Sequence, residues 1–267
     1  MPLARVNGIQ LSYERYGSGD PVVLVTGAGA KGRAWRPYQV PALTTAGFEA
    51  ITVDNRGVPP TDSGPGPFGI DDMAADVAGL IRELGIEGCR VLGFSLGGMI
   101  VQEMLLACPD LVSQAVLMAT CGRQDVLRLA LTRAEWELLD SGVTVPPRYA
   151  AVVQAMQYLS PRTLNDDTQV QDWLEIFELS QDSSIGRAQR GVDLVGNRLE
   201  DYRKIGTRCL ALGFRDDLMI APHLCRELAD FIPDCRYVEV ADCGHFGFLE
   251  RPDVVNQHIV DFFTAGR

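Results

Sequence analysis

Short apolar runs alternate with amphipathic segments along most of this chain. Residues 21–25, 49–53 and 90–94 are mainly apolar runs of strand length, which predict buried strands. Segments 71–84 and 96–106 carry their apolar positions at helical spacing, which predicts helices with one buried face. Strands that alternate with helices in this way indicate a mostly parallel sheet with helices on both faces.

The pattern differs at the start and in the middle of the chain. Residues 6–16 alternate around Asn7-Gly8, a strong turn dipeptide, so we expect an antiparallel hairpin. Residues 122–205 are largely helical in pattern and rich in large side chains, with Pro146-Pro147 and Asp166-Asp167 as breaks. Strands and helices alternate again after residue 206. The sequence therefore predicts a core formed by 1–121 and 206–267, with a helical cap, 122–205, inserted over the carboxyl edge of the sheet.

A serine stands at the end of the apolar run 90–94. Gly93 and Gly97 lie two residues on either side of Ser95, and a predicted helix begins directly afterwards. This order is typical of a nucleophile elbow, in which the serine occupies the apex of a tight, strained turn. Its hydroxyl then projects over a helix N-terminus, which favours developing negative charge. The pattern predicts that Ser95 is a nucleophile.

A serine nucleophile needs a base within hydrogen-bond reach and a third group that orients the base. Of the three histidines, His223 lies in the first turn of a predicted helix and His258 lies inside the last helix. His245 follows a strand in a loop, so we predict that it is the general base and acid. Asp216 and Asp217 both follow the preceding predicted strand, and either carboxylate can orient this histidine.

Composition narrows the range of partners and compartments. The net charge is −11, which argues against nucleic acid and anionic membranes because both require clustered cations. No signal-peptide pattern opens the sequence, and no apolar run reaches the ~18 residues of a membrane helix. Seven scattered cysteines without a CxxC pair predict buried thiols in a reducing cytoplasm. We therefore expect a cytoplasmic protein that binds a small molecule, and a homodimer is left open.

From its first hairpin to its last loop, the chain resembles the α/β-hydrolase family. The segments that carry the resemblance are the hairpin 6–16, Val25–Gly29, Val53–Gly57, Gly93–Gly97, Gly213–Asp216 and Gly244–Phe246. The resemblance implies an α/β-hydrolase fold with an eight-stranded, mostly parallel sheet, and a triad in the chain order serine, acid, histidine. The family's Gly-x-x-Asp pattern ends at Asp216, which implies Asp216 as the acid and leaves Asp217 to cap the following helix.

Acyl transfer also requires an oxyanion hole made of two main-chain N–H groups. The resemblance implies that Leu96, the residue after the nucleophile, and Ala28, in the loop after the third predicted strand, supply them. In the family this loop usually carries His-Gly, whereas this chain has Thr26-Gly27. The resemblance therefore does not indicate which residues hold the loop in place. A phosphate-binding role for the same glycine-rich loop is disfavoured, because the Gly-Lys-Ser/Thr ending is missing.

These features predict a serine hydrolase that cleaves a small to medium, largely apolar ester, lactone or thioester through an acyl-enzyme on Ser95. No metal or organic cofactor is implied. A serine at the elbow argues against the family's epoxide hydrolases and haloalkane dehalogenases, which place an aspartate there. Residues 54–61 resemble those of hydrolase-like proteins in bacterial natural-product pathways, so a lyase or cyclisation catalyst stays open. A non-catalytic small-molecule receptor also stays open, although an intact Ser95, Asp216 and His245 set argues against it.

Overall fold

The computed structural model describes residues 1–180, 188–189, 191–192 and 196–265. Within these residues, eight strands form one sheet in the order β1-β2-β4-β3-β5-β6-β7-β8. The first two pairs, β1–β2 and β2–β4, are antiparallel, and the other neighbouring pairs are parallel. The strands are β1 (Leu3–Val6), β2 (Ile9–Tyr16), β3 (Asp20–Val25), β4 (Phe48–Val53), β5 (Cys89–Phe94), β6 (Val112–Met118), β7 (Arg208–Phe214) and β8 (Cys235–Val240).

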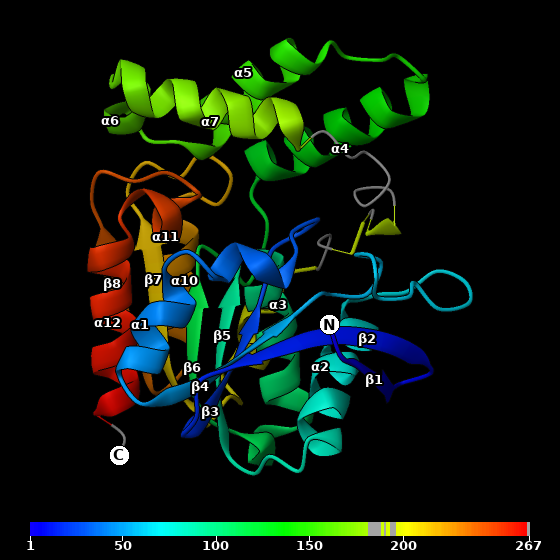
Figure 1. Ribbon diagram of the computed structural model, residues 1–267, viewed down its shortest axis with the longest axis vertical. Coiled ribbons are helices and arrows are strands. Elements are labelled where there is room, and N and C mark those ends of the chain that lie inside the picture. The colour runs from blue at the N-terminus through cyan, green and yellow to red at the C-terminus, as the bar shows by residue number, and fades with distance from the viewer. Residues whose placement is uncertain (181–187, 190, 193–195, 266–267) are drawn as a thin grey trace.

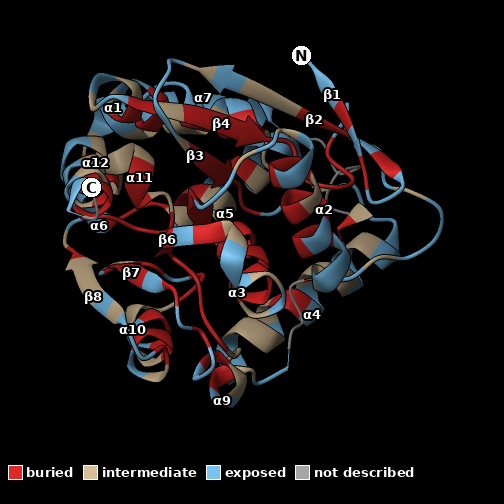
Figure 2. Ribbon diagram, turned by 90° about the horizontal axis from the view of Figure 1, so that it is seen from below, coloured by how far each residue is buried: buried red, intermediate tan, exposed pale blue. Residues whose placement is uncertain are grey.

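Helices cover both faces of the sheet because the central strands are apolar on both sides. Alternate residues of β3, Val22 and Leu24 against Val23 and Val25, enter two separate hydrophobic clusters. One cluster includes side chains of α2 (Ile70–Glu83), α3 (Leu96–Ala107) and α10 (Pro222–Phe231). The other includes side chains of α1 (Gln39–Thr45) and α12 (Pro252–Thr264). Figure 2 shows the resulting distribution, with buried strands inside and exposed outer helix surfaces.

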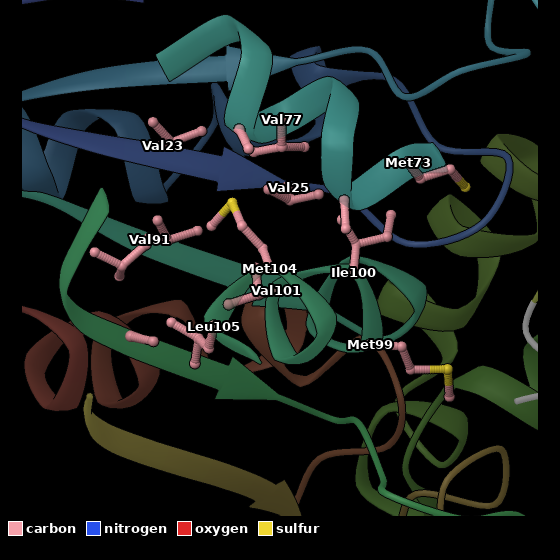
Figure 3. Close-up of a cluster of buried hydrophobic side chains, with 14 of the residues drawn as sticks. Val23, Val25, Met73, Val77, Val91, Met99, Ile100, Val101, Met104 and Leu105 are labelled. Atoms are coloured by element: carbon pink, nitrogen blue, oxygen red, sulfur yellow. The ribbon is translucent and has the colours of Figure 1, made fainter. Parts of the chain in front are cut away.

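Helices α2 and α3 show how the apolar spacing becomes packing. In Figure 3, Met73 and Val77 of α2 and Ile100 and Met104 of α3 point into the same cluster. The two positions on each helix are four residues apart, so they lie on one side of that helix. Val25 on β3 completes the contact from the sheet, and the elbow helix is therefore held firmly against the core.

Between β6 and β7 the described chain is helical. Figure 1 shows α4, α5, α6 and α7 above the carboxyl ends of the strands, and we call these four the cap helices. Side chains of Asp125, Ser160 and Asp166 accept hydrogen bonds from main-chain N–H groups at the starts of α4, α6 and α7. The bounds are α4 (Val126–Ser141), α5 (Pro147–Tyr158), α6 (Pro161–Leu164) and α7 (Asp167–Leu179), and the short α9 (Leu199–Tyr202) follows before β7.

The structure adds short helices that the hydrophobic pattern does not predict. They are α1, the 3₁₀ helix η1 (Gly32–Trp35) and α11 (Gly247–Glu250), and a second 3₁₀ turn, η2 (Pro109–Leu111), precedes β6. Each has seven residues or fewer, which is too short for a helical period to stand out from a loop. None of the described helices is both long and apolar enough to cross a lipid bilayer.

Candidate active site

Ser95 lies where β5 turns sharply into α3. Its backbone has φ 53° and ψ −118°, a strained conformation for a residue with a side chain. A Cβ atom on Gly93 would overlap the carbonyl oxygen of Gly97, and one on Gly97 would overlap that of Val25. Only glycine fits at these two positions, which explains the Gly-x-Ser-x-Gly spacing. The serine therefore stands at the apex of a nucleophile elbow, as the sequence predicted.

A continuous hydrogen-bonded chain joins three side chains from three separate loops. The Ser95 Oγ atom lies 3.1 Å from Nε2 of His245. On the other side of the ring, Nδ1 of His245 lies 2.7 Å from Oδ2 of Asp217. When Nδ1 carries the proton and donates it to the carboxylate, Nε2 is free to accept from the serine hydroxyl. The structure thus brings a serine, a histidine and an aspartate together in the arrangement that, in catalytic triads, activates the serine.

The prediction that Asp216 orients His245 is wrong, because the carboxylate in contact with the histidine belongs to Asp217. Asp216 is half-buried, and its main-chain N–H donates to the carbonyl oxygen of Cys243. Burial, together with the negative charges of Asp242 and Glu250, raises the pKa of Asp216. The Gly-x-x-Asp pattern located the correct turn and missed the carboxylate that contacts His245 by one residue.

The expectation that Asp217 caps the following helix is wrong: α10 has Ala221 at its N-cap and no side-chain capping bond, and Asp217 instead holds the histidine and the turn before that helix. Its Oδ1 atom accepts hydrogen bonds from the main-chain N–H groups of Met219 and Ile220, at 2.8 and 2.9 Å. Its Oδ2 atom faces His245, and the side chain has no exposed surface. A buried carboxylate requires such partners. One carboxylate oxygen thus holds the turn that precedes α10, and the other holds His245.

The predicted oxyanion donors lie on two different elements, the start of α3 and the loop after β3. Leu96 is the first residue of α3, so its main-chain N–H has no acceptor within the helix. Ala28 lies in the loop that follows β3, and it lines the same cavity as Ser95. Since β3 and β5 are neighbours in the sheet, their carboxyl ends deliver the two loops to one place.

Side chains remote in sequence brace the Ala28 loop, which lacks the usual histidine. The amide of Asn55 donates to the carbonyl oxygen of Thr26 at 2.9 Å, and Thr26 Oγ1 donates to the carbonyl oxygen of Ala30 at 3.0 Å. Gln189, which is buried, accepts from the Gly29 N–H at 2.8 Å through Oε1. Its Nε2 donates to the carbonyl oxygen of Arg56 at 2.9 Å. No local motif marks Gln189, because its partners lie more than 130 residues away along the chain.

Asp54 and Arg56 have structural roles beside the site. Asp54 Oδ1 accepts from the Gly32 N–H at 2.7 Å, which fixes the far end of the Ala28 loop. Arg56 binds both carboxylate oxygens of Asp76 on α2, and both side chains are almost fully buried. The paired guanidinium and carboxylate satisfy one another in the core, so neither is directed at the serine.

A cavity of about 700 Å³ lies between the sheet edge and the cap helices, with Ser95 and His245 in its wall. Its apolar side is aromatic: Tyr158 stacks on Phe246 with ring centroids 4.8 Å apart, and Trp173 stacks on Phe177 at 5.4 Å. Tyr158, Trp173 and Phe177 are cap residues that line the cavity. Two other large side chains of the region 122–205 do not line the cavity: Tyr149 is exposed, and Tyr202 is buried beside Glu103.

Glu250 joins the cap to the loop that carries His245. Its Oε1 accepts hydrogen bonds from the N–H and Oγ of Ser160 and from Oγ1 of Thr163, at 2.6 to 2.9 Å. Its Oε2 accepts from the Gly244 N–H at 2.6 Å. One carboxylate thus ties the start of α6 to the residue that precedes the histidine, a connection that the sequence did not predict.

The described residues offer neither a metal-binding cluster nor a disulfide. They contain no group of three or more His, Cys, Asp or Glu side chains placed to hold a metal ion. All seven cysteines are free thiols. Cys243 lies two residues before His245, and burial raises the pKa of its thiol well above the ordinary value. A thiol of this kind stays protonated and is a poor nucleophile.

The chain belongs to the alpha/beta hydrolase family, whose model matches residues 22–258. A Mycobacterium tuberculosis (strain H37Rv) protein named “Putative non-heme bromoperoxidase BpoC” is 45% identical over 259 residues, which cover 96% of this chain and 98% of that protein. The crystal structure of that protein superposes with a TM-score of 0.92 and 43% identity, covering 96% of each chain.

Two more distant relatives are named for hydrolytic reactions at a carbonyl group. An Azorhizobium caulinodans protein named “Putative carbamate hydrolase RutD” is 29% identical over 272 residues, covering 98% of each chain. The crystal structure of the enol-lactonase from Burkholderia xenovorans LB400 has a TM-score of 0.79 and 25% identity, covering 98% of this chain and all of that one. This chain is therefore similar in fold over its full length to enzymes named for different substrates.

Proposed function

We propose that this protein is a serine hydrolase that cleaves an ester, lactone or thioester through an acyl-enzyme on Ser95. The observation that carries the proposal is the hydrogen-bonded chain from Ser95 through His245 to Asp217 in the wall of a cavity. The names of the RutD and enol-lactonase relatives also support attack on a carbonyl carbon.

The geometry supports a two-step acyl transfer. His245 Nε2 takes the serine proton as Oγ attacks the substrate carbonyl carbon, and the N–H groups of Leu96 and Ala28 stabilise the oxyanion. The imidazolium, stabilised by Asp217, then gives that proton to the leaving oxygen or sulfur as its bond to carbon breaks. In the second step His245 removes a proton from water, whose oxygen attacks the acyl carbon. The acid is released, and the proton returns to Ser95.

A fluorophosphonate probe tests the nucleophile without knowledge of the substrate. We expect one adduct on the intact protein, mapped to the peptide that contains Ser95. Ser95→Ala should abolish the adduct and lower ester hydrolysis by about 10⁴-fold or more, while the circular dichroism spectrum stays unchanged. Folded wild-type protein that forms no adduct would contradict the covalent mechanism and favour the lyase or receptor hypothesis.

The name of the BpoC relative supports a second candidate, the oxidation of bromide. That reaction requires a peroxide as the oxidant. Hydrogen peroxide in place of water at the acyl-enzyme would release a peracid, which transfers an oxygen atom to bromide and leaves hypobromite and the carboxylic acid. Bromination of a dye in the presence of a short carboxylic acid, bromide and peroxide measures this activity. We expect Ser95→Ala to abolish it; bromination that survives in this variant would place halide oxidation elsewhere.

A further inference from the structure

The charge of the cavity wall is opposite to that of the protein. The chain has 35 acidic and 24 basic residues. Among the described residues that line the cavity, however, the charged ones are Lys31, Arg33 and Arg128, and none is acidic. A concave site lined by one sign of charge attracts ligands of the opposite sign, and its low-dielectric walls strengthen that attraction. The cavity is therefore suited to an anion, although the protein as a whole repels one.

Arg128 is the cation that the cap contributes to the cavity wall. It belongs to the first turn of α4, which is the part of that helix closest to the sheet in Figure 1. Burial raises the pKa of Tyr158, another residue of the cavity wall, to about 12, and the positive charge of Arg128 acts in the opposite direction. The ring of Tyr158 is in turn 5.9 Å from that of His245. Glu135 and Asp217 also act on Tyr158, but neither lines the cavity.

Lys31 and Arg33 lie across the cavity on the loop that follows Ala28. Arg33 is exposed and Lys31 is half-buried. No ion pair involves either side chain within the described part of the chain. An exposed cation such as Arg33 contributes mainly to the rate at which an anion arrives, an effect that salt screens. A half-buried guanidinium such as Arg128 contributes instead to binding, since it presents a planar, permanently charged donor set that fits a carboxylate with two hydrogen bonds.

We propose that the substrate is an ester, lactone or thioester whose acyl part carries a carboxylate, which Arg128 binds on the cap side of the cavity. The proposal rests on the proposed function, because it assigns the acyl group that Ser95 receives. The aromatic wall formed by Tyr158, Trp173 and Phe177 then packs against the apolar carbons between the carboxylate and the reacting carbonyl. The substrate is thus apolar along its length and anionic at one end.

Two esters that differ in a single terminal group provide the test. p-Nitrophenyl hexanoate and mono-p-nitrophenyl adipate have the same leaving group and acyl length, but one ends in a methyl group and the other in a carboxylate. The measured quantity is the ratio of kcat/KM for the adipate to kcat/KM for the hexanoate. We expect Arg128→Gln to lower this ratio about tenfold or more and Arg128→Lys to lower it less. Arg148→Gln is the matched control, because the Arg148 side chain is 89% exposed on α5 and does not line the cavity.

The steering role of the loop cations is measured with the same substrates. Added salt should lower the ratio in the wild-type protein, and the double variant Lys31→Gln, Arg33→Gln should show a weaker salt dependence. A ratio that is the same in the wild type, Arg128→Gln and Arg128→Lys would overturn the proposal. Fluorophosphonate labelling of Ser95 in each variant keeps the two hypotheses apart. Normal labelling with an unchanged ratio contradicts only the carboxylate site, whereas absent labelling of the folded wild type contradicts the hydrolase mechanism.

Discussion

Helix α3 begins directly after Ser95 in the cavity wall, and α4 reaches the same wall through Arg128, yet the fold holds the two helices very differently. Ten residues of α3 are buried, including glycines and polar side chains, so the helix is enclosed by the sheet and its neighbours. In α4 only Thr132 is buried among sixteen residues, and apolar side chains such as Val126 and Leu127 are exposed. The proposed nucleophile thus precedes a closely packed helix, whereas Arg128, the proposed substrate contact, lies on a lightly packed one.

This difference separates two requirements of a catalytic site. Proton transfer and oxyanion stabilisation need atoms held to within fractions of an ångström, which close packing provides. Recognition of a particular acyl group needs only a wall of suitable shape and charge. Changes in the cap can therefore alter the substrate without disturbing Ser95, His245 or Asp217, and the relatives named for different substrates are consistent with this separation.

The largest expected effect is at the acid, where neighbouring residues give a matched pair. Asp217→Asn should lower kcat for ester hydrolysis by about 10³- to 10⁴-fold, because the amide no longer stabilises the imidazolium form of His245. Asp216→Asn should change kcat less than threefold or so, since that side chain does not contact the histidine. Steady-state kinetics on one activated ester provide the measurement, and similar losses in both variants would contradict the assignment of the acid to Asp217.

Two leucines test the contrast between core and cap. Leu105 on α3 is 1% exposed and Leu127 on α4 is 67% exposed. Leu105→Ala should lower the free energy of unfolding by about 2–5 kcal/mol, because it leaves a cavity in the cluster of Figure 3. Leu127→Ala should change it by no more than about 0.5 kcal/mol. Urea denaturation measures both values. A cost at Leu127 equal to that at Leu105 would mean that α4 is covered in solution.

A smaller effect on kcat is expected at Gln189, which follows the cap helices in the chain and braces the Ala28 loop. Gln189→Met keeps the side-chain length but removes the hydrogen bonds to the Gly29 N–H and to the carbonyl oxygen of Arg56. We expect kcat to fall about tenfold with little change in KM, because a misplaced Ala28 N–H weakens transition-state stabilisation more than ground-state binding. Gln171→Met, at an exposed position on α7, is the control. A change confined to thermal stability would limit Gln189 to a structural role.

The sequence by itself determined the alternation of strands and helices, the hairpin around Asn7-Gly8 and the elbow at Ser95. These features are local, because the period of apolar residues, the turn residues and the glycine spacing can each be read from a short stretch of the chain. The same is true of His245, since it is the histidine that follows a strand in a loop. Such signals predict which residues stand at the carboxyl edge of the sheet.

Only the tertiary structure decided between Asp216 and Asp217. It alone also showed that Asn55 and Gln189 brace the Ala28 loop and that Glu250 connects the cap to the His245 loop. Each of these depends on the direction of a side chain or on partners tens to more than a hundred residues away, and no local pattern encodes either. The charge of the cavity wall belongs to the same group. Lys31, Arg33 and Arg128 do not stand out in an acidic sequence. They line one cavity only because folding brings the loop after β3 and the cap together.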